Sequence, residues 1–134
     1  MPVRFTLSKN ERLKRRKIIE QLFSAGKSVA AHPVRVQYFF AAGLTHNLQA
    51  GFSASARQFK KAPDRNRIKR LMREGFRLQK NELNEKLVNK QLKLAVFFIY
   101  TGNELPAYTT VSEKIGLLLN KLIRIVNEMD TTGA

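Results

Sequence analysis

The pattern of apolar and polar positions is most regular from Arg65 to about Lys80, where it has the period of a helix. Pro63 and Asp64 stand just ahead of it. Proline in a first turn and a carboxylate near the positive end of the helix dipole both favour a helix start. One side of this helix collects Ile68, Leu71, Met72, Gly75 and Leu78. The other side collects Asn66, Lys69, Arg70, Arg73, Arg77 and Lys80. The pattern therefore predicts a helix anchored by one apolar side, with a basic ridge on the other.

Four strands are predicted from apolar runs. Residues 27–31 are expected to form a short strand, and residues 34–40 alternate between apolar and mixed positions, which is typical of a strand with one apolar face. Residues 48–55 are expected to form a third strand that pairs with the second. Residues 92–100 are the most apolar segment of the chain and predict a central strand.

Two further helices are predicted toward the ends of the chain. Ser8 and Glu11 have the spacing of a capping box, and the first helix is expected to run to about Phe23. Ser112 is the expected N-cap of a last helix, in which apolar residues recur at helical spacing up to about Glu128.

These elements give the order helix, three strands, helix, strand, helix. We expect a single domain over residues 1–134 with an α/β fold, a two-layer sandwich in which the helices pack against one four-stranded sheet. The end of the second helix stays open. Asn81 and Asn84 are poor interior residues for a helix, whereas Leu83 and Leu87 would allow it to continue.

The charge of the chain favours a nucleic-acid partner. Of its 134 residues, 25 are Lys or Arg against 10 Asp or Glu, giving a formal charge of +15. On the predicted basic helix, Arg65, Lys69 and Arg73 repeat every four residues, and each like-charge pair costs about 0.2–0.5 kcal/mol. A polyanionic partner would offset this repulsion.

The sequence also indicates a compartment. It has no cysteine, which excludes disulfides and thiolate metal sites. Residues 1–6 lack an apolar signal core, and the longest apolar run, residues 94–100, is far too short to span a bilayer. We therefore expect a cytoplasmic protein with no membrane partner.

The residues that catalysis would need are missing. His32 and His46 are the only histidines, and neither has metal-ligand spacing with another histidine or a carboxylate. Asp64 and Glu74 accompany the basic helix, where helix-dipole and ion-pair roles explain them better than acid–base chemistry. No Ser/His/Asp set and no Gly-rich phosphate loop is present. A self-sufficient nuclease is not expected, and no catalytic or metal-binding residue is assigned.

Each candidate binding feature has a second interpretation. The basic helix could be a solvated face, but its density and its excess of arginine favour phosphate binding. For the basic cluster of the first helix, which includes Arg12, a solvated face and a phosphate contact are equally supported. For Phe23 and Phe39 the periodicity favours core packing, with stacking on unpaired bases as the alternative.

Residues 59–74, with the sequence FKKAPDRNRIKRLMRE, resemble the signature of the bacterial ribonuclease P protein component. Residues 13–26 are similar to the first helix of that family, and residues 97–100 to its last strand. The resemblance implies a small protein that binds a large catalytic RNA and assists removal of the 5′ leader from precursor tRNA. It also implies that the RNA holds the Mg²⁺ ions and performs the chemistry. The protein would bind no metal alone and would act as one copy per RNA.

The resemblance also implies two sets of binding residues. The set that contacts the RNA subunit would be Arg57, Lys60, Lys61, Arg65, Asn66, Arg67, Lys69, Arg70 and Arg73. A cleft between the first helix and the sheet would hold the single-stranded leader with Arg12, Ile19, Phe23, Gln37 and Phe39. Ile19 and Gln37 stand where aromatic residues are common in the family, so we expect only apolar contact from Ile19. Phe39, on the strand face of Gln37, is the expected replacement for stacking.

Proteins of other classes would also account for the positive charge of this chain. A structural ribosomal or RNA-chaperone protein would bind RNA without assisting cleavage, and a freestanding nuclease would cleave with no RNA subunit added. Processing of precursor tRNA at low magnesium, with the RNA subunit and with or without this protein, separates a ribonuclease P subunit from a structural or RNA-chaperone protein. Cleavage by the protein with no RNA subunit added would indicate the freestanding nuclease.

Overall fold

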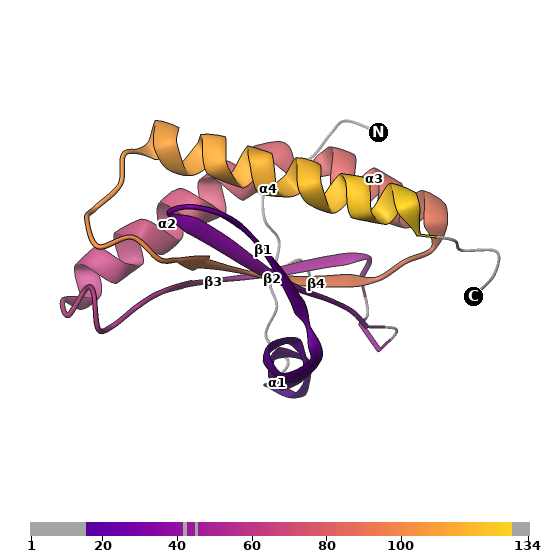
Figure 1. Cartoon of the computed structure of the whole chain (residues 1–134), viewed down its shortest axis with the longest axis horizontal. Coiled ribbons are helices and arrows are strands. Elements are labelled where there is room, and N and C mark those ends of the chain that lie inside the picture. The colour runs from indigo at the N-terminus through magenta and orange to yellow at the C-terminus, as the bar shows by residue number, and fades with distance from the viewer. Residues whose placement is uncertain (1–15, 42, 45, 130–134) are drawn as a thin grey trace.

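The computed structural model describes residues 16–41, 43, 44 and 46–129. Its four strands form one sheet in the order β1–β2–β4–β3 (Figure 1). β1 (Lys27–Ala31) and β2 (Val34–Phe40) form an antiparallel hairpin, and β2 is also antiparallel to β4 (Leu94–Tyr100). β3 (Leu48–Ala54) is parallel to β4. The apolar segment is therefore a central strand, as predicted.

The expected pairing of the third strand with the second was wrong, because β4 lies between them. β4 is apolar on both of its faces, which favours an interior place in the sheet and leaves β3 at the edge. A parallel pair cannot be joined by a tight turn. The crossover from β3 to β4 is made by two helices, α2 (Ala62–Gln79) and α3 (Asn81–Lys90).

The helices cover both faces of the sheet (Figure 1). α2, α3 and α4 (Tyr108–Glu128) lie on one face, and α1 (Arg16–Ala25) lies on the other. The predicted α/β class, the single four-stranded sheet and the order of elements are confirmed, whereas α1 adds a layer to the predicted two-layer sandwich because it packs on the second face of the sheet. Ser8 and Glu11, the proposed start of the first helix, lie outside the described residues.

The structure settles one helix boundary that the sequence left open and corrects another. α3 begins at Asn81, directly after Lys80, and ends at Lys90. Its C-cap, Gln91, is left-handed, and the N–H of the next residue, Leu92, donates to the Leu87 carbonyl at 2.9 Å. α4 begins at Tyr108, four residues before the predicted cap. Ser112 is not a cap: its Oγ and carbonyl oxygen contact Gln79 Nε2 of α2, at 3.2 and 2.9 Å.

Successive side chains of β4 point to opposite faces of the sheet, so the strand contributes to two hydrophobic cores. Leu94, Val96 and Phe98 face α2, α3 and α4 and belong to the larger core. Ala95 faces α1 and is buried with Ile18, Leu22, Ala41 and Leu44 in a smaller one. The smaller core fixes α1, which carries Ile19 and Phe23, against the sheet.

Candidate nucleic-acid interface

The burial of α2 largely follows its predicted stripe. Ile68, Met72, Gly75 and Phe76 are buried, so the helix is anchored along this side. Leu78 was expected on the anchored side but is 43% exposed, and Phe76 takes the inward position. The reason is that Leu78 lies about 120° around the helix from the buried Met72, whereas Phe76 lies only about 40° from it.

Two cations expected on the basic side of α2 are not available as free surface charges. Lys80 was expected on the basic side but is only 3% exposed, because the chain turns there into α3. Arg77 donates two hydrogen bonds to the Glu74 carboxylate, one of them from Nε at 3.0 Å. This bond lowers the pKa of Glu74 and raises the pKa of Arg77. Ion pairing by Glu74 is therefore confirmed, and Arg77 is neutralised.

Arg65 and Arg73, both assigned to RNA binding, hold contacts within the protein. Arg65 Nη1 donates to the carbonyl oxygens of Phe59 at 2.7 Å and Lys60 at 3.0 Å. The Arg73 guanidinium lies 5.8 Å from the ring centroid of Phe52 on β3, a cation–π contact. Both arginines are half-buried. Arg65 thus holds the loop before α2, and Arg73 contacts β3, while both side chains also contribute positive charge.

The remaining assigned residues lie at the start of α2 and in the loop before it. Within the described part of the chain, no carboxylate pairs with the cations of this group. Lys69 is half-buried and the others are exposed. We define the basic surface as Arg57, Lys60, Lys61, Asn66, Arg67, Lys69 and Arg70.

The loop before α2 presents part of this surface. Phe59 is buried, with its ring centroid 5.9 Å from that of Tyr100, and its backbone N–H donates to the Ser55 carbonyl at 2.9 Å. The hydrogen bonds from Arg65 tie the same loop to the helix. Lys60 and Lys61 are thereby placed at the helix N-terminus, where the dipole also favours anions.

The described residues assigned to the predicted cleft lie on the other face of the sheet, on α1 and on β2. Phe23 of α1 is 46% exposed, and its ring centroid is 5.2 Å from that of Phe97 of β4 in an edge-to-face contact. Gln37 is the register partner of Phe97 and is half-buried. Ile19 and Phe39 are half-buried against the smaller core. The structure therefore brings Phe23 and Gln37 together, with Ile19 and Phe39 in the adjacent wall.

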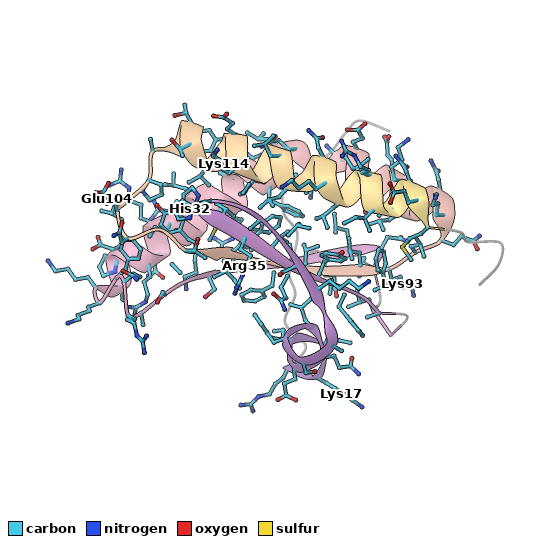
Figure 2. All side chains as sticks on the ribbon, in the orientation of Figure 1. Lys17, His32, Arg35, Lys93, Glu104 and Lys114 are labelled. Carbon is cyan, nitrogen blue, oxygen red and sulfur yellow. The ribbon has the colours of Figure 1, made fainter. Side chains whose placement is uncertain are left out.

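One residue assigned to the predicted cleft is not described, and one aromatic residue beside the others was missed. Arg12 lies outside the described residues. Phe97 was not assigned to the cleft, although strand alternation places it on the opposite face from Val96 and Phe98. Lys17 projects from α1 away from the sheet (Figure 2), so this cation of the first-helix cluster does not line the cleft.

Neither metal ligation nor membrane insertion has support in the described residues. Residues 16–41, 43, 44 and 46–129 contain no group of three or more His, Cys, Asp or Glu side chains that could hold a metal ion. In the same part of the chain, no helix is both long enough and apolar enough to cross a bilayer.

The fold and these two surfaces define a small basic α/β protein with features suited to RNA. A family model described as Ribonuclease P matches residues 7–122, and the chain belongs to the ribonuclease P protein family. The Ribonuclease P protein component of Porphyromonas gingivalis is 35% identical to this chain, over 98% of the chain and 95% of the relative.

Other relatives agree in sequence and in fold. The Ribonuclease P protein component of Caldanaerobacter subterraneus is 34% identical, over 82% of this chain and 87% of that protein. The solved structure of the Staphylococcus aureus RNase P protein has a TM-score of 0.55 at 24% identity, covering 90% of this chain and 98% of the other. At that identity the structural match supports the fold alone.

Proposed function

We propose that this protein is the subunit of ribonuclease P that binds the catalytic RNA through the basic surface and the 5′ leader of precursor tRNA through the cleft. It assists endonucleolytic 5′ maturation of tRNA in the cytoplasm, as one protein per RNA subunit. The observation that carries the proposal is the concentration of cations, such as Lys61, Arg67 and Arg70, at the start of an anchored helix, where they have no carboxylate partner among the described residues.

This arrangement suits phosphate binding for an energetic reason. Exposed cations that are not neutralised by carboxylates can release the counterions of an RNA backbone, and this release drives association. Arginine can also bind phosphate oxygens with two parallel hydrogen bonds. Because α2 is anchored by Ile68, Met72 and Phe76, its arginines lose little freedom of the backbone when RNA binds.

The side chains of the basic surface support different roles for the protein and the RNA subunit. Hydrolysis of a phosphodiester needs an activated water and stabilisation of charge, commonly by metal ions. The basic surface contributes positive charge and no general base. In this proposal the RNA subunit binds the Mg²⁺ ions and performs the cleavage, and the protein positions the RNA and the substrate.

Reconstitution tests the proposal directly. The purified protein is added to the RNA subunit of the same organism, and cleavage of precursor tRNA is measured at low Mg²⁺. We expect the protein to accelerate cleavage at the mature 5′ end and to have no activity without the RNA. Binding of the RNA subunit with no change in cleavage would favour the RNA-chaperone alternative, and cleavage by the protein alone would favour a nuclease.

A further inference from the structure

Three connections leave the sheet at the same end. Val34 at the start of β2 and Ala54 at the end of β3 are both register partners of Tyr100, the last residue of β4. The turn between β1 and β2, the loop between β3 and α2 and the loop between β4 and α4 therefore emerge at one end of the molecule (Figure 1). The loop between β3 and α2 carries Lys60 and Lys61 of the basic surface. The hairpin turn thus shares its end of the sheet with part of the basic surface.

Direct contacts hold these three connections together. Thr101 donates twice to the Pro33 carbonyl oxygen, from its backbone N–H at 2.7 Å and from Oγ1 at 3.1 Å. A Cβ atom at Gly102 would lie 2.6 Å from the Tyr100 hydroxyl oxygen and 3.0 Å from Cβ of Pro33, so the chain packs closely against the turn at this point. The Tyr100 ring also contacts that of Phe59, which directly precedes the two lysines, with centroids 5.9 Å apart. The hairpin turn is therefore held in a fixed position relative to the basic surface.

His32 is exposed at this turn and has more positive than negative groups near it. Arg35 of β2 is the register partner of Ala30, and Lys121 of α4 donates from Nζ to the Ala30 carbonyl oxygen at 3.0 Å. Glu104 is the only carboxylate of the loop between β4 and α4, and it lies at the same end of the molecule (Figure 2). In the described part of the chain, neither Glu104 nor any other carboxylate pairs with His32. A protonated imidazole here would therefore be a cation able to bind an external anion.

We propose that the turn between β1 and β2 extends the RNA-binding surface, and that His32 in its protonated form contacts a phosphate group of the RNA subunit. Histidine is the side chain whose charge ordinarily changes between about pH 5 and 8, whereas the phosphates of the RNA backbone stay anionic. The RNA subunit is the partner because the turn is held beside Lys60 and Lys61 of the basic surface. This inference rests on the proposed function, and its consequence is RNA binding that strengthens as the pH falls.

The histidine content of the chain supplies a matched control. The sequence has only two histidines, and the second, His46, precedes β3 and so lies at the opposite end of the sheet. Affinity of the full chain for the RNA subunit is measured at about pH 7.5 and about pH 5.5 at one salt concentration, a range in which histidine changes charge. The wild type is compared with His32→Gln and His46→Gln, because glutamine is polar but cannot be protonated. Circular dichroism at both pH values confirms that the variants are folded.

We expect the wild type to bind the RNA subunit about fivefold more tightly at the lower pH, which is the upper range for an exposed ion pair. His32→Gln should abolish this gain, and His46→Gln should retain it. At the lower pH the slope of log affinity against log salt should also be steeper for the wild type than for His32→Gln, by roughly 0.7–0.9 for one added phosphate contact. No gain in the wild type, or an equal gain in His32→Gln, would overturn the assignment.

A permanent cation and a second RNA complete the test. His32→Lys carries its charge at both pH values, so it should bind the RNA subunit at the higher pH about as tightly as the wild type does at the lower pH. Binding of precursor tRNA to the assembled holoenzyme is measured with the same variants, and a pH effect confined to the precursor would overturn the RNA subunit as the partner. Failure of the wild type to bind the RNA subunit at either pH would instead overturn the proposed function.

Discussion

Arg65 Nη1 lies 2.7 Å from the carbonyl oxygen of Phe59, and this bond links the most basic helix to the loop that precedes it. The same nitrogen donates to the Lys60 carbonyl at 3.0 Å. An arginine has five N–H donors, of which Nη1 carries two. Arg65 can therefore secure the loop and still offer donors to a phosphate group.

Replacing Arg65 by alanine should destabilise the protein before RNA is considered. We expect the free energy of unfolding to fall by about 1–2 kcal/mol, because two hydrogen bonds from a charged donor are lost. Urea denaturation followed by circular dichroism measures the change. Arg67→Ala is the matched control, since that exposed side chain holds no such bond in the described structure, and equal stability of the two variants would contradict the role of Arg65.

Removing charge from the basic surface should weaken RNA binding without altering the fold. Lys61, Arg67 and Arg70 are exposed, so changing all three to alanine leaves the core intact. The slope of log affinity for the RNA subunit against log salt should become shallower by roughly 2, since each lost phosphate contact removes about 0.7–0.9.

The control for this change removes the same charge elsewhere. Lys86, Lys114 and Arg124 lie on α3 and α4, away from the basic surface. Changing these three residues to alanine should lower the overall affinity slightly through net charge. If this variant and the Lys61, Arg67 and Arg70 variant lose affinity equally, RNA binding depends on net charge alone and the basic surface has no special part.

Gly26 should tolerate no side chain. A Cβ atom there would lie 2.2 Å from the Leu22 carbonyl oxygen and 2.8 Å from that of Tyr38, and neither backbone atom can rotate away. We expect Gly26→Ala to reduce the free energy of unfolding by about 1–3 kcal/mol. Gly43→Ala is the control, because nothing lies within 4 Å of a Cβ at that position. A thermal unfolding series distinguishes them, and similar midpoints would argue against the observed close approach at Gly26.

Lys90 stabilises the end of α4 from the neighbouring helix. Its Nζ donates to the carbonyl oxygens of Val126, Asn127 and Met129 at 2.8, 2.9 and 2.8 Å. Lys90→Met keeps the aliphatic stem and removes the ammonium, so stability should fall by about 1–3 kcal/mol. Hydrogen exchange should quicken in the last turn of α4. Lys86→Met, on the same helix, should leave that exchange rate unchanged.

Local periodicity in the sequence determined most of the elements. The alternation in residues 34–40 corresponds to β2, and the apolar segment before Tyr100 corresponds to β4. Pro63 and Asp64 correctly indicated the start of α2, which begins at Ala62. These predictions hold because strand and helix periods depend on neighbouring residues. The segment from Phe59 to Glu74 also sufficed to indicate the family that the comparisons confirm.

Tertiary structure alone decided how these elements meet. The parallel pairing of β3 with β4, the position of α1 on its own face of the sheet, and the contact of Phe23 with Phe97 all join segments far apart in the chain. Their energies come from burying apolar surface between those segments, which no local period encodes. The sequence thus determined which residues are basic or apolar, and packing decided that Phe97 meets Phe23 of α1 and that Arg65 holds the loop before α2.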